Sequence, residues 1–275
     1  MDLEKLPETK LTRTLYSSEV EALLVKERAA RQDSNAVLSH QMLTDIVKLV
    51  YEAGNINSLC EVMVLLATKR GQPVRAQVEM VKLCMGWIES IKDMDQKLKF
   101  IDTIKSVCDK KIYLEVEYAR CCLMLVKFNE TSENIDEAAK ILQDVQVETY
   151  GSMEYREKIE FILYQMKILI VKEDWIRLMI VSRKINTKYL EIEDLEDLTI
   201  VYYSYLFILH KQDKAYLDAS RALKKIYDLL KANSKRVQEQ SKNLDFGFTL
   251  DMVPIMNNSI YLSVLNTNCE EKTAL

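Results

Sequence analysis

The 275-residue chain has 48% hydrophobic and 29% charged residues but only five glycines and three prolines, a composition that favours helices over the strands and turns of a β protein. The 38 basic and 42 acidic residues nearly balance at a net charge of −4, which argues against a nucleic-acid-binding protein with a clustered basic face. At this length the chain can bury a large apolar core.

Residues 1–35 are predicted to form an N-terminal polar or helical segment. Residues 1–31 lack the apolar run of a secretory signal peptide, and no run in the chain reaches the 18 apolar residues of a membrane span. The nearest candidate span, residues 246–265, is interrupted by Asp251 and Pro254. The six cysteines, at positions 60, 84, 108, 121, 122 and 269, form no CxxC motif and lie mostly on apolar helical faces. They are therefore predicted to be reduced core thiols of an intracellular protein.

Residues that open helices recur at a nearly constant interval. Asn57, Asp95, Asp136, Asp174 and Asp213 each begin an apolar-periodic run, and the intervals between them are 38, 41, 38 and 39 positions. A recurring unit of about 40 residues, each a helix pair, is typical of an α-solenoid. The Trp, Gly and Tyr consensus positions of an ordinary tetratricopeptide repeat are missing. The prediction is therefore an all-α fold, a right-handed α-solenoid of degenerate tetratricopeptide-like helix pairs.

Residues 146–189 show one such unit most clearly. Apolar side chains at positions 159, 162, 163, 166, 169 and 170 follow the period of one helical face. After the charged turn 172–174, Asp174 is expected to cap a second helix. One side of that helix would carry Trp175, Leu178, Met179, Ser182 and Ile185, and the small Ser182 would allow two helices to approach closely.

Four further features of the connections are predicted. Gly151 is expected to adopt a positive φ, and Ser152 to cap the helix that follows. Asn134 and Glu137 match a capping box at the start of the preceding helix. The turn 147–153 is interpreted as the connection that sets the angle between two repeat helices; the alternative is a loop that docks a partner.

No set of residues in the chain resembles a catalytic, cofactor-binding or metal site. His40 and His210 are 170 positions apart, and the five glycines are scattered rather than gathered in a phosphate-binding loop. Asp93 and Asp95 are better explained by a helix cap than by metal binding, and 202–205 (YYSY) by the packed flank of a helix. The chain is predicted not to be an enzyme and to need no cofactor. All-α enzymes such as prenyltransferases are the enzymatic alternative, and the missing metal set counts against them.

Several blocks resemble one known family in the same order along the chain. They are VETYGSM at 147–153, EKIEFIL at 157–163 and SRKINTKY at 182–189, with 50–53, 98–104, 111–117 and 136–142. Over residues 37–230 the chain resembles the N-terminal half of the 26S proteasome lid subunits of the non-ATPase regulatory subunit 12 type, which belong to the PCI family. The resemblance weakens through 231–256 and resumes at 259–265.

The resemblance implies a non-catalytic scaffold subunit of the regulatory-particle lid that supports ubiquitin-dependent protein degradation in the cytoplasm and nucleus. The implied partners are other lid subunits, base subunits and core-particle subunits, with no nucleic acid, membrane or small-molecule substrate. One alternative is the related subunit 4 of the COP9 signalosome, against which VETYGSM and 185–189 (INTKY) argue. The other is a free-standing helical-repeat adaptor that binds peptides in a concave groove.

The resemblance also suggests how the chain is divided. Residues 36–230 would form the helical-repeat arm, and 231–275 would continue it, weakly matched, up to a point before the PCI winged helix. Because 266–275 do not resemble a polar capping repeat, we expect a fragment, a truncated gene product or a shortened paralogue. Such a chain would have an exposed apolar end near 255–265, and its incorporation into a lid would be in doubt.

Overall fold

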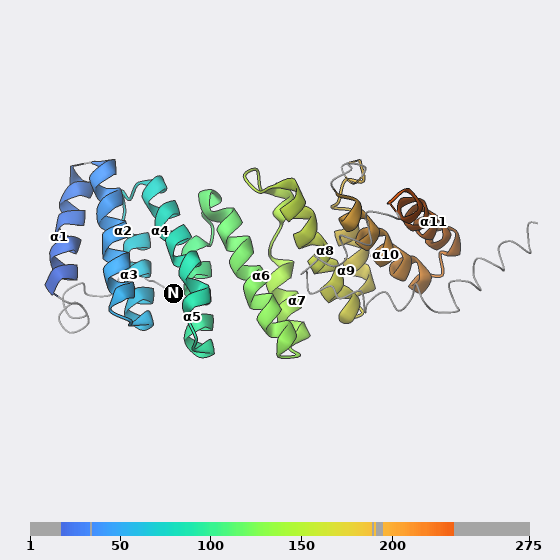
Figure 1. Cartoon of the computed structure of the whole chain (residues 1–275), viewed down its shortest axis with the longest axis horizontal. Helices are drawn as coiled ribbons and strands as arrows, with labels where there is room; N and C mark the ends of the chain where they lie inside the picture. The colour runs from blue at the N-terminus through green and yellow to red at the C-terminus, as the bar shows by residue number, and fades with distance from the viewer. Residues whose placement is uncertain (1–17, 34, 189, 191–194, 234–275) are drawn as a thin grey trace, which may run out of the picture. The chain divides into compact units, whose positions relative to one another are not determined.

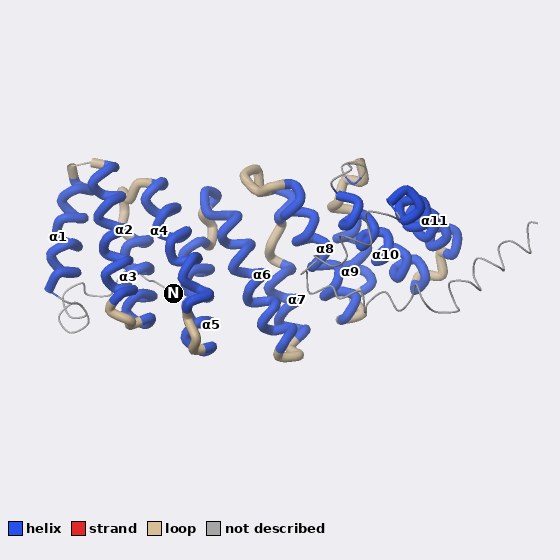
Figure 2. The backbone as a smooth tube through the Cα atoms, in the orientation of Figure 1, coloured by secondary structure: helices blue, strands red, loops and turns tan. Residues whose placement is uncertain are grey.

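The computed structural model describes residues 18–33, 35–188, 190 and 195–233, and within these residues it contains helices and no strand (Figures 1 and 2). The prediction of an all-α protein is therefore confirmed. The chain divides into two compact units between Tyr189 and Leu190, and each unit is described by itself.

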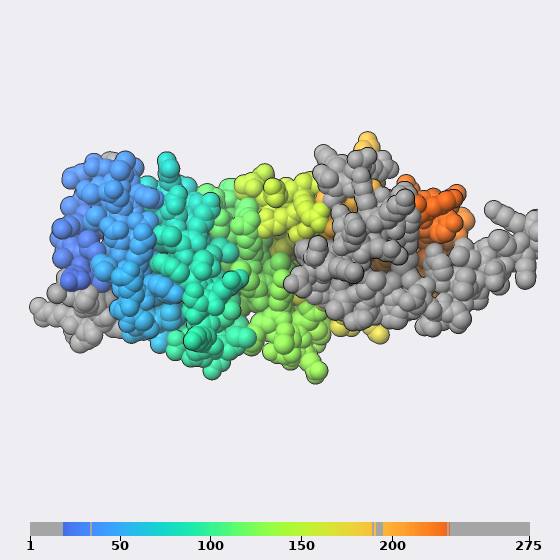
Figure 3. Space-filling model, in the orientation of Figure 1, coloured from blue at the N-terminus to red at the C-terminus, as the bar shows by residue number. Residues whose placement is uncertain are grey.

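The first unit consists of nine α-helices and three short 3₁₀ turns among the described residues. They are α1 (Ser18–Gln32), α2 (Ala36–Glu52), α3 (Ile56–Thr68), α4 (Val74–Trp87), η1 (Ile88–Ser90), α5 (Met94–Cys108), η2 (Ile112–Leu114), α6 (Glu115–Thr131), α7 (Ile135–Gln143), η3 (Val147–Thr149), α8 (Tyr155–Val171) and α9 (Trp175–Ser182). Extensive packing joins helices that are near in sequence, such as α1 with α2, α3 with α5, and α6 with α7. The side chains fill the spaces between these helices along the unit (Figure 3).

The helices repeat with a regular period. Helices α2, α4, α6 and α8 begin at Ala36, Val74, Glu115 and Tyr155, so that successive starts lie 38, 41 and 40 positions apart. Helices α3, α5, α7 and α9 each begin 20 positions after their partner and therefore advance by the same steps. A repeated helix hairpin that packs on its sequence neighbours is an α-solenoid, and this part of the prediction is confirmed. The right-handed sense stays a prediction.

The residues that open the helices were placed correctly to within two positions in most repeats. Asp174 caps α9, because its Oδ1 accepts a hydrogen bond from the Arg177 backbone N at 3.2 Å. The cap of α3 is Asn55 rather than Asn57. The prediction for Asp213 was wrong, since this residue ends α10.

The capping contacts predicted for Asn134 and Ser152 were also wrong. Asn134 precedes α7, but its side chain makes no capping hydrogen bond to any described residue, and Glu137 instead pairs with Lys140 at 3.1 Å. Ser152 does not cap α8, which begins three residues later; its Oγ donates to Glu115 Oε1 at 3.2 Å. The Met153 side chain is buried, 6% exposed, before the helix begins, and Glu154 still has a non-helical backbone with a ψ of 144°.

Apart from the connection between α4 and α5, the turns inside the hairpins contain a residue in the left-handed region. Glu173 has a φ of 62°, and its backbone N donates to Ile170 O at 3.0 Å while the Asp174 N donates to Leu169 O at 3.0 Å. These two bonds define a Schellman motif, in which glycine is the usual left-handed residue. Glu133 closes the α6–α7 turn in the same way with a φ of 58°. Gly151, for which a positive φ was predicted, is not among the residues with positive φ.

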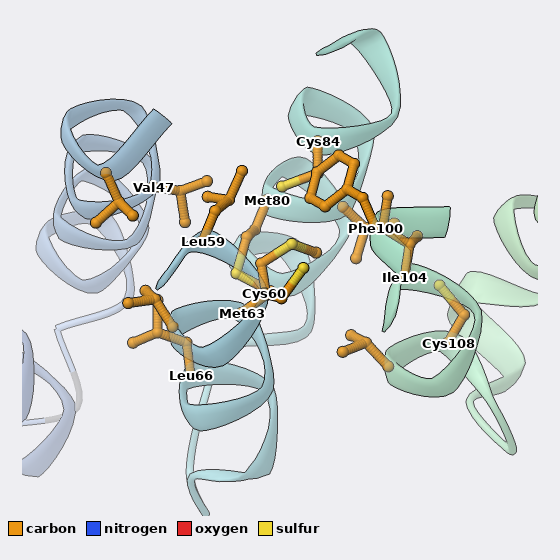
Figure 4. Packing of buried hydrophobic residues seen from close by; sticks show 14 of the residues in the cluster. Val47, Leu59, Cys60, Met63, Leu66, Met80, Cys84, Phe100, Ile104 and Cys108 are labelled. Carbon is orange, nitrogen blue, oxygen red and sulfur yellow. The ribbon is translucent and has the colours of Figure 1, made fainter. Parts of the chain in front are cut away.

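A continuous apolar cluster forms the core of α2 to α6. Phe100, Leu59 and Met63 are completely buried where α3, α4 and α5 meet (Figure 4). Five cysteines, at 60, 84, 108, 121 and 122, are buried as free thiols, which confirms the prediction for these positions, while Cys269 lies outside the described residues. Burial raises the pKa of Cys84 far above its ordinary value. Such thiols behave as small apolar side chains.

The second unit contains α10 (Glu196–Gln212) and α11 (Tyr216–Asn233), which pack extensively against each other as a helix hairpin. Tyr202 and Tyr205 are 4% and 5% exposed, so the prediction of a packed tyrosine flank is confirmed. Burial raises the pKa of Tyr202 to about 12. The predicted divisions at 35/36 and 230/231 stay predictions, and the expectations for 234–275 fall outside the described residues.

Candidate protein-interaction surface

The side chains considered for chemistry have structural roles. Asp93 is the cap of α5, with its Oδ1 3.2 Å from the Asp95 backbone N. Across the described residues, no three His, Cys, Asp or Glu side chains lie close enough to hold a metal ion. None of the helices in this part of the chain has the length and apolar character to cross a membrane. The absence of catalytic residues stays a prediction.

The turn 147–153 connects α7 to α8 and is held at both ends. Val147 is completely buried and Met153 is 6% exposed, so two apolar side chains fix the turn to the core. The hydrogen bond from Ser152 to Glu115 ties the turn to the start of α6. These contacts favour the interpretation that the turn sets the angle between helices.

Polar side chains fasten α1 to the start of the solenoid. Glu27, whose side chain is 3% exposed, accepts hydrogen bonds at Oε1 from Gln72 Nε2 at 2.7 Å and from Arg31 Nε at 3.1 Å. Arg31 Nη1 also donates to the Arg70 carbonyl at 2.9 Å, and Ser39 Oγ donates to Gln72 Oε1 at 3.4 Å. We call these five residues the α1 clasp. A buried carboxylate is stable only with such partners.

Comparable contacts join α6 to α8. Arg120 and Glu157 form a bidentate ion pair, with Nε–Oε1 and Nη2–Oε2 distances of 2.6 and 2.9 Å. Glu130 binds Lys167 at 2.5 Å and accepts a hydrogen bond from the Tyr164 hydroxyl. Burial raises the pKa of Glu130, but the hydrogen bonds from Lys167 and Tyr164 outweigh it, and the pKa lies below its ordinary value.

Polar contacts between successive repeats continue into the last repeat of the first unit. Three polar pairs join side chains 34 to 36 positions apart, so each pair links similar places in successive repeats: Asp136–Lys172 at 2.5 Å, Gln143–Arg177 at 2.8 Å and Glu148–Lys184 at 2.7 Å. The pairs are mostly half-exposed, and each contributes little to stability alone. Together they fix the spacing between neighbouring repeats.

Helix α9 presents an apolar surface. Only two of its eight residues, Leu178 and Ser182, are buried. Ile176 is 78% exposed and Ile180 59% exposed, and Met179 lies beside them at 37%. Residues three and four apart share one face of a helix, so these three form a ridge, which we call the α9 ridge. The predicted buried positions Leu178, Ser182 and Ile185 are confirmed, but Met179 was wrongly expected on the packed side because α9 touches other helices along only a narrow stripe.

A pocket of about 210 Å³ opens beside the α9 ridge, between α7, α8 and α9. We call it the α9 pocket. Its lining is mainly apolar, with Arg177, Lys184, Gln143 and Gln165 as the polar members: the apolar residues are Ala139, Leu142, Ile168, Leu169, Ile180 and Val181.

Gln165 is the unusual residue of this pocket. Its side chain is largely buried, and Nε2 donates to the Leu142 and Val145 carbonyls at 2.9 and 3.0 Å. Its Oε1 is buried and accepts no hydrogen bond from any residue that the structure describes. Gln165 was not among the residues predicted from the sequence, although a polar residue in the middle of the long apolar helix α8 is a signal for it.

Among the described residues, the geometry defines an all-α helical-repeat protein with an exposed apolar ridge on α9, the last helix of its first unit. Residues 18–239 match the family described as "PSMD12/CSN4, N-terminal", and the chain belongs to this family.

Named relatives agree with the resemblance inferred from the sequence blocks. The chain is 39% identical over 209 residues to 26S proteasome non-ATPase regulatory subunit 12 of Dictyostelium discoideum, with 76% of this chain and 47% of the relative covered. It is 34% identical over 256 residues to 26S proteasome regulatory subunit RPN5 of Saccharomyces cerevisiae, with 92% and 58% covered. The chain thus spans about half the length of the curated relatives it matches.

Among solved structures, BtubC (BKLC) from P. vanneervenii has a TM-score of 0.45 and 12% identity over 80% of this chain and 94% of that one. This similarity is too low to bear on fold or function.

Proposed function

We propose that the chain is a non-catalytic scaffold subunit of the 26S proteasome regulatory-particle lid, acting in the cytoplasm and nucleus in ubiquitin-dependent protein degradation. The observation that carries the proposal is the 34–39% identity to relatives named as proteasome regulatory subunits. The proposed partners are other lid subunits together with base and core-particle subunits.

The fold supports a mechanical role. A solenoid holds its surfaces at distances set by the angle between repeats. In the first unit, polar pairs such as Arg120–Glu157 and Lys184–Glu148 oppose changes in that angle. The scaffold would therefore act by keeping its contact surfaces at fixed separations, with no cofactor and no bond made or broken.

A scaffold of the COP9 signalosome is the second candidate, because the family description covers proteins of both names. The relatives reported above carry only the proteasome name, and they favour the first candidate.

The test is purification of the endogenously tagged protein at low salt, with quantitative mass spectrometry of what accompanies it. Stoichiometric recovery of lid, base and core-particle subunits is the expected result. Stoichiometric signalosome subunits would transfer the proposal to that complex. Recovery of neither set would refute both scaffold assignments.

A further inference from the structure

We propose that the α9 pocket receives one aromatic side chain that carries a hydrogen-bond donor, Trp or Tyr, from a helix of a partner protein. The inference concerns this surface alone and holds whichever assembly the chain joins.

The size of the pocket indicates a single anchor. Its volume of about 210 Å³ is below the roughly 300–1,000 Å³ of typical small-molecule sites. Protein interfaces often place one large side chain in a pocket of this kind, and Trp, Tyr and Arg are the residues most often found there. A partner side chain therefore fits better than a cofactor.

The charges of the pocket select among these three side chains. Both ionised groups of the lining, Arg177 and Lys184, are cations, and each already has a carboxylate partner, Asp174 at 3.3 Å and Glu148 at 2.7 Å. An incoming Arg would meet two positive charges whose counter-ions are already engaged. The apolar lining instead favours an aromatic ring.

The unpartnered oxygen of Gln165 selects an aromatic side chain with a donor. Gln165 is 4% exposed, and its Oε1 is the one polar atom of the described pocket lining that is buried without a hydrogen-bond partner. A buried acceptor is unfavourable until a donor reaches it. The indole N–H of Trp or the hydroxyl of Tyr supplies that donor, whereas Phe does not.

The surroundings of the pocket indicate that the anchor arrives on a helix. Ile180 lines the pocket and also belongs to the α9 ridge, so the apolar surface continues from the ridge into the pocket. Ile176 extends this surface by one helical turn. An amphipathic helix with apolar residues at i, i+3 and i+4 matches such a ridge, and the Arg177 and Lys184 ion pairs form a polar rim.

The first test uses two isomers of equal size. In 3-methylindole the N–H is present; in 1-methylindole a methyl group replaces its hydrogen. Each is titrated into the full chain while methyl NMR signals of Ile168, Leu169 and Ile180 are followed. We expect 3-methylindole to shift these signals with a dissociation constant on the order of 1 mM, and 1-methylindole to bind about tenfold more weakly. Equal binding of the isomers, or no shift with either, would overturn the proposal.

A matched pair of variants locates the binding. Ala139→Leu fills the pocket from a position that is 4% exposed, and Ile112→Ala alters a side chain on η2 that is 83% exposed. With thermal unfolding checked for both, 3-methylindole binding should be lost in Ala139→Leu and kept in Ile112→Ala. Unchanged binding in a folded Ala139→Leu would place the ligand elsewhere and refute the proposal.

The second test uses the tagged protein in cells, with a photo-crosslinking amino acid at position 180 and, as control, at position 112. A crosslink from position 180 to a helical segment with a Trp or Tyr beside it is expected. If lid subunits co-purify but position 180 crosslinks to no such segment, the pocket proposal fails and the scaffold proposal stands. If no lid subunit co-purifies while the isomers still discriminate, the scaffold proposal fails and the donor-selective pocket stands.

Discussion

The α1 clasp makes a strong prediction about the stability of the first helix. In Glu27→Ala the carboxylate that accepts hydrogen bonds from Gln72 and Arg31 is removed. Hydrogen bonds to a charged group contribute about 1.5–3 kcal/mol each. The loss is reduced because Arg31 keeps its bond to the Arg70 carbonyl and its side chain is 16% exposed, so water can reach it. The net cost is about 3 kcal/mol, or a factor of about 150 in the equilibrium for opening α1.

Hydrogen exchange read by mass spectrometry measures this opening directly. Amides in 18–33 should lose about two orders of magnitude of protection in Glu27→Ala, while those in α5 should keep theirs. Glu21→Ala is the control, because Glu21 is exposed on the same helix. When Gln72→Leu is already present, Glu27→Ala should reduce the protection of these amides less than it does in the unsubstituted protein, because the two residues share one hydrogen bond. A change of less than about threefold in α1 would show that apolar contacts of Val20 and Ala30 alone hold the helix.

Three further outcomes are expected. Glu173→Gly should raise the free energy of unfolding of the first unit by about 0.5–1 kcal/mol, measured by urea unfolding. The left-handed backbone costs a non-glycine residue about 1–2 kcal/mol, and part of the gain is lost because glycine gives the unfolded chain more conformational entropy. A lower urea midpoint would contradict the Schellman geometry. The pKa of Glu130 is lowered, so its stabilising contribution is present above the ordinary value of 4.5 and lost as pH falls through the lower folded value. Glu130→Gln should therefore flatten the dependence of unfolding free energy on pH between about 5 and 3, and an unchanged slope would refute the assignment. Iodoacetamide at pH 8 should leave Cys84 unmodified in the folded protein and modify it in guanidinium, because burial raises the pKa of this thiol and blocks access to it. Mass spectrometry measures the modification. Rapid modification of the folded protein would contradict the position of Cys84 in the core.

The repeat was predictable because helix starts carry local signals. Asp174 caps α9 through its own side chain, and such residues recur with the period of the hairpins. The failure at Ser152 has a tertiary cause, because Met153 is buried and Ser152 binds Glu115, 37 positions away in the sequence. The failure at Asn134 has a local cause, because Glu137 pairs with Lys140 on the same helix. A capping pattern does not show which of these partners a side chain takes.

The candidate site was not predictable in the same way. Six consecutive residues of α8, 161–166, are buried, so the helix is covered nearly all round and its polar member Gln165 has no exposed face to mark it. Its bonds reach carbonyls 20 and 23 positions away. Sequence periodicity identifies one apolar stripe on α9, but it does not show that the stripe facing solvent is apolar as well.

The constant offset of 20 residues within every hairpin has a consequence for how such chains vary. From α2–α3 to α10–α11 the second helix always begins 20 positions after the first, so the variation in the period lies between the start of one hairpin's second helix and the start of the next hairpin. A residue gained or lost inside a hairpin would rotate one helix by about 100° against its partner and turn its apolar face away from the core. A residue gained between hairpins leaves the two helices of each hairpin in register with each other. Length variation among related chains, and tolerated sites for inserting a label or tag, should therefore fall between hairpins, at exposed positions away from the buried residues Gln72, Leu114, Val147 and Met153.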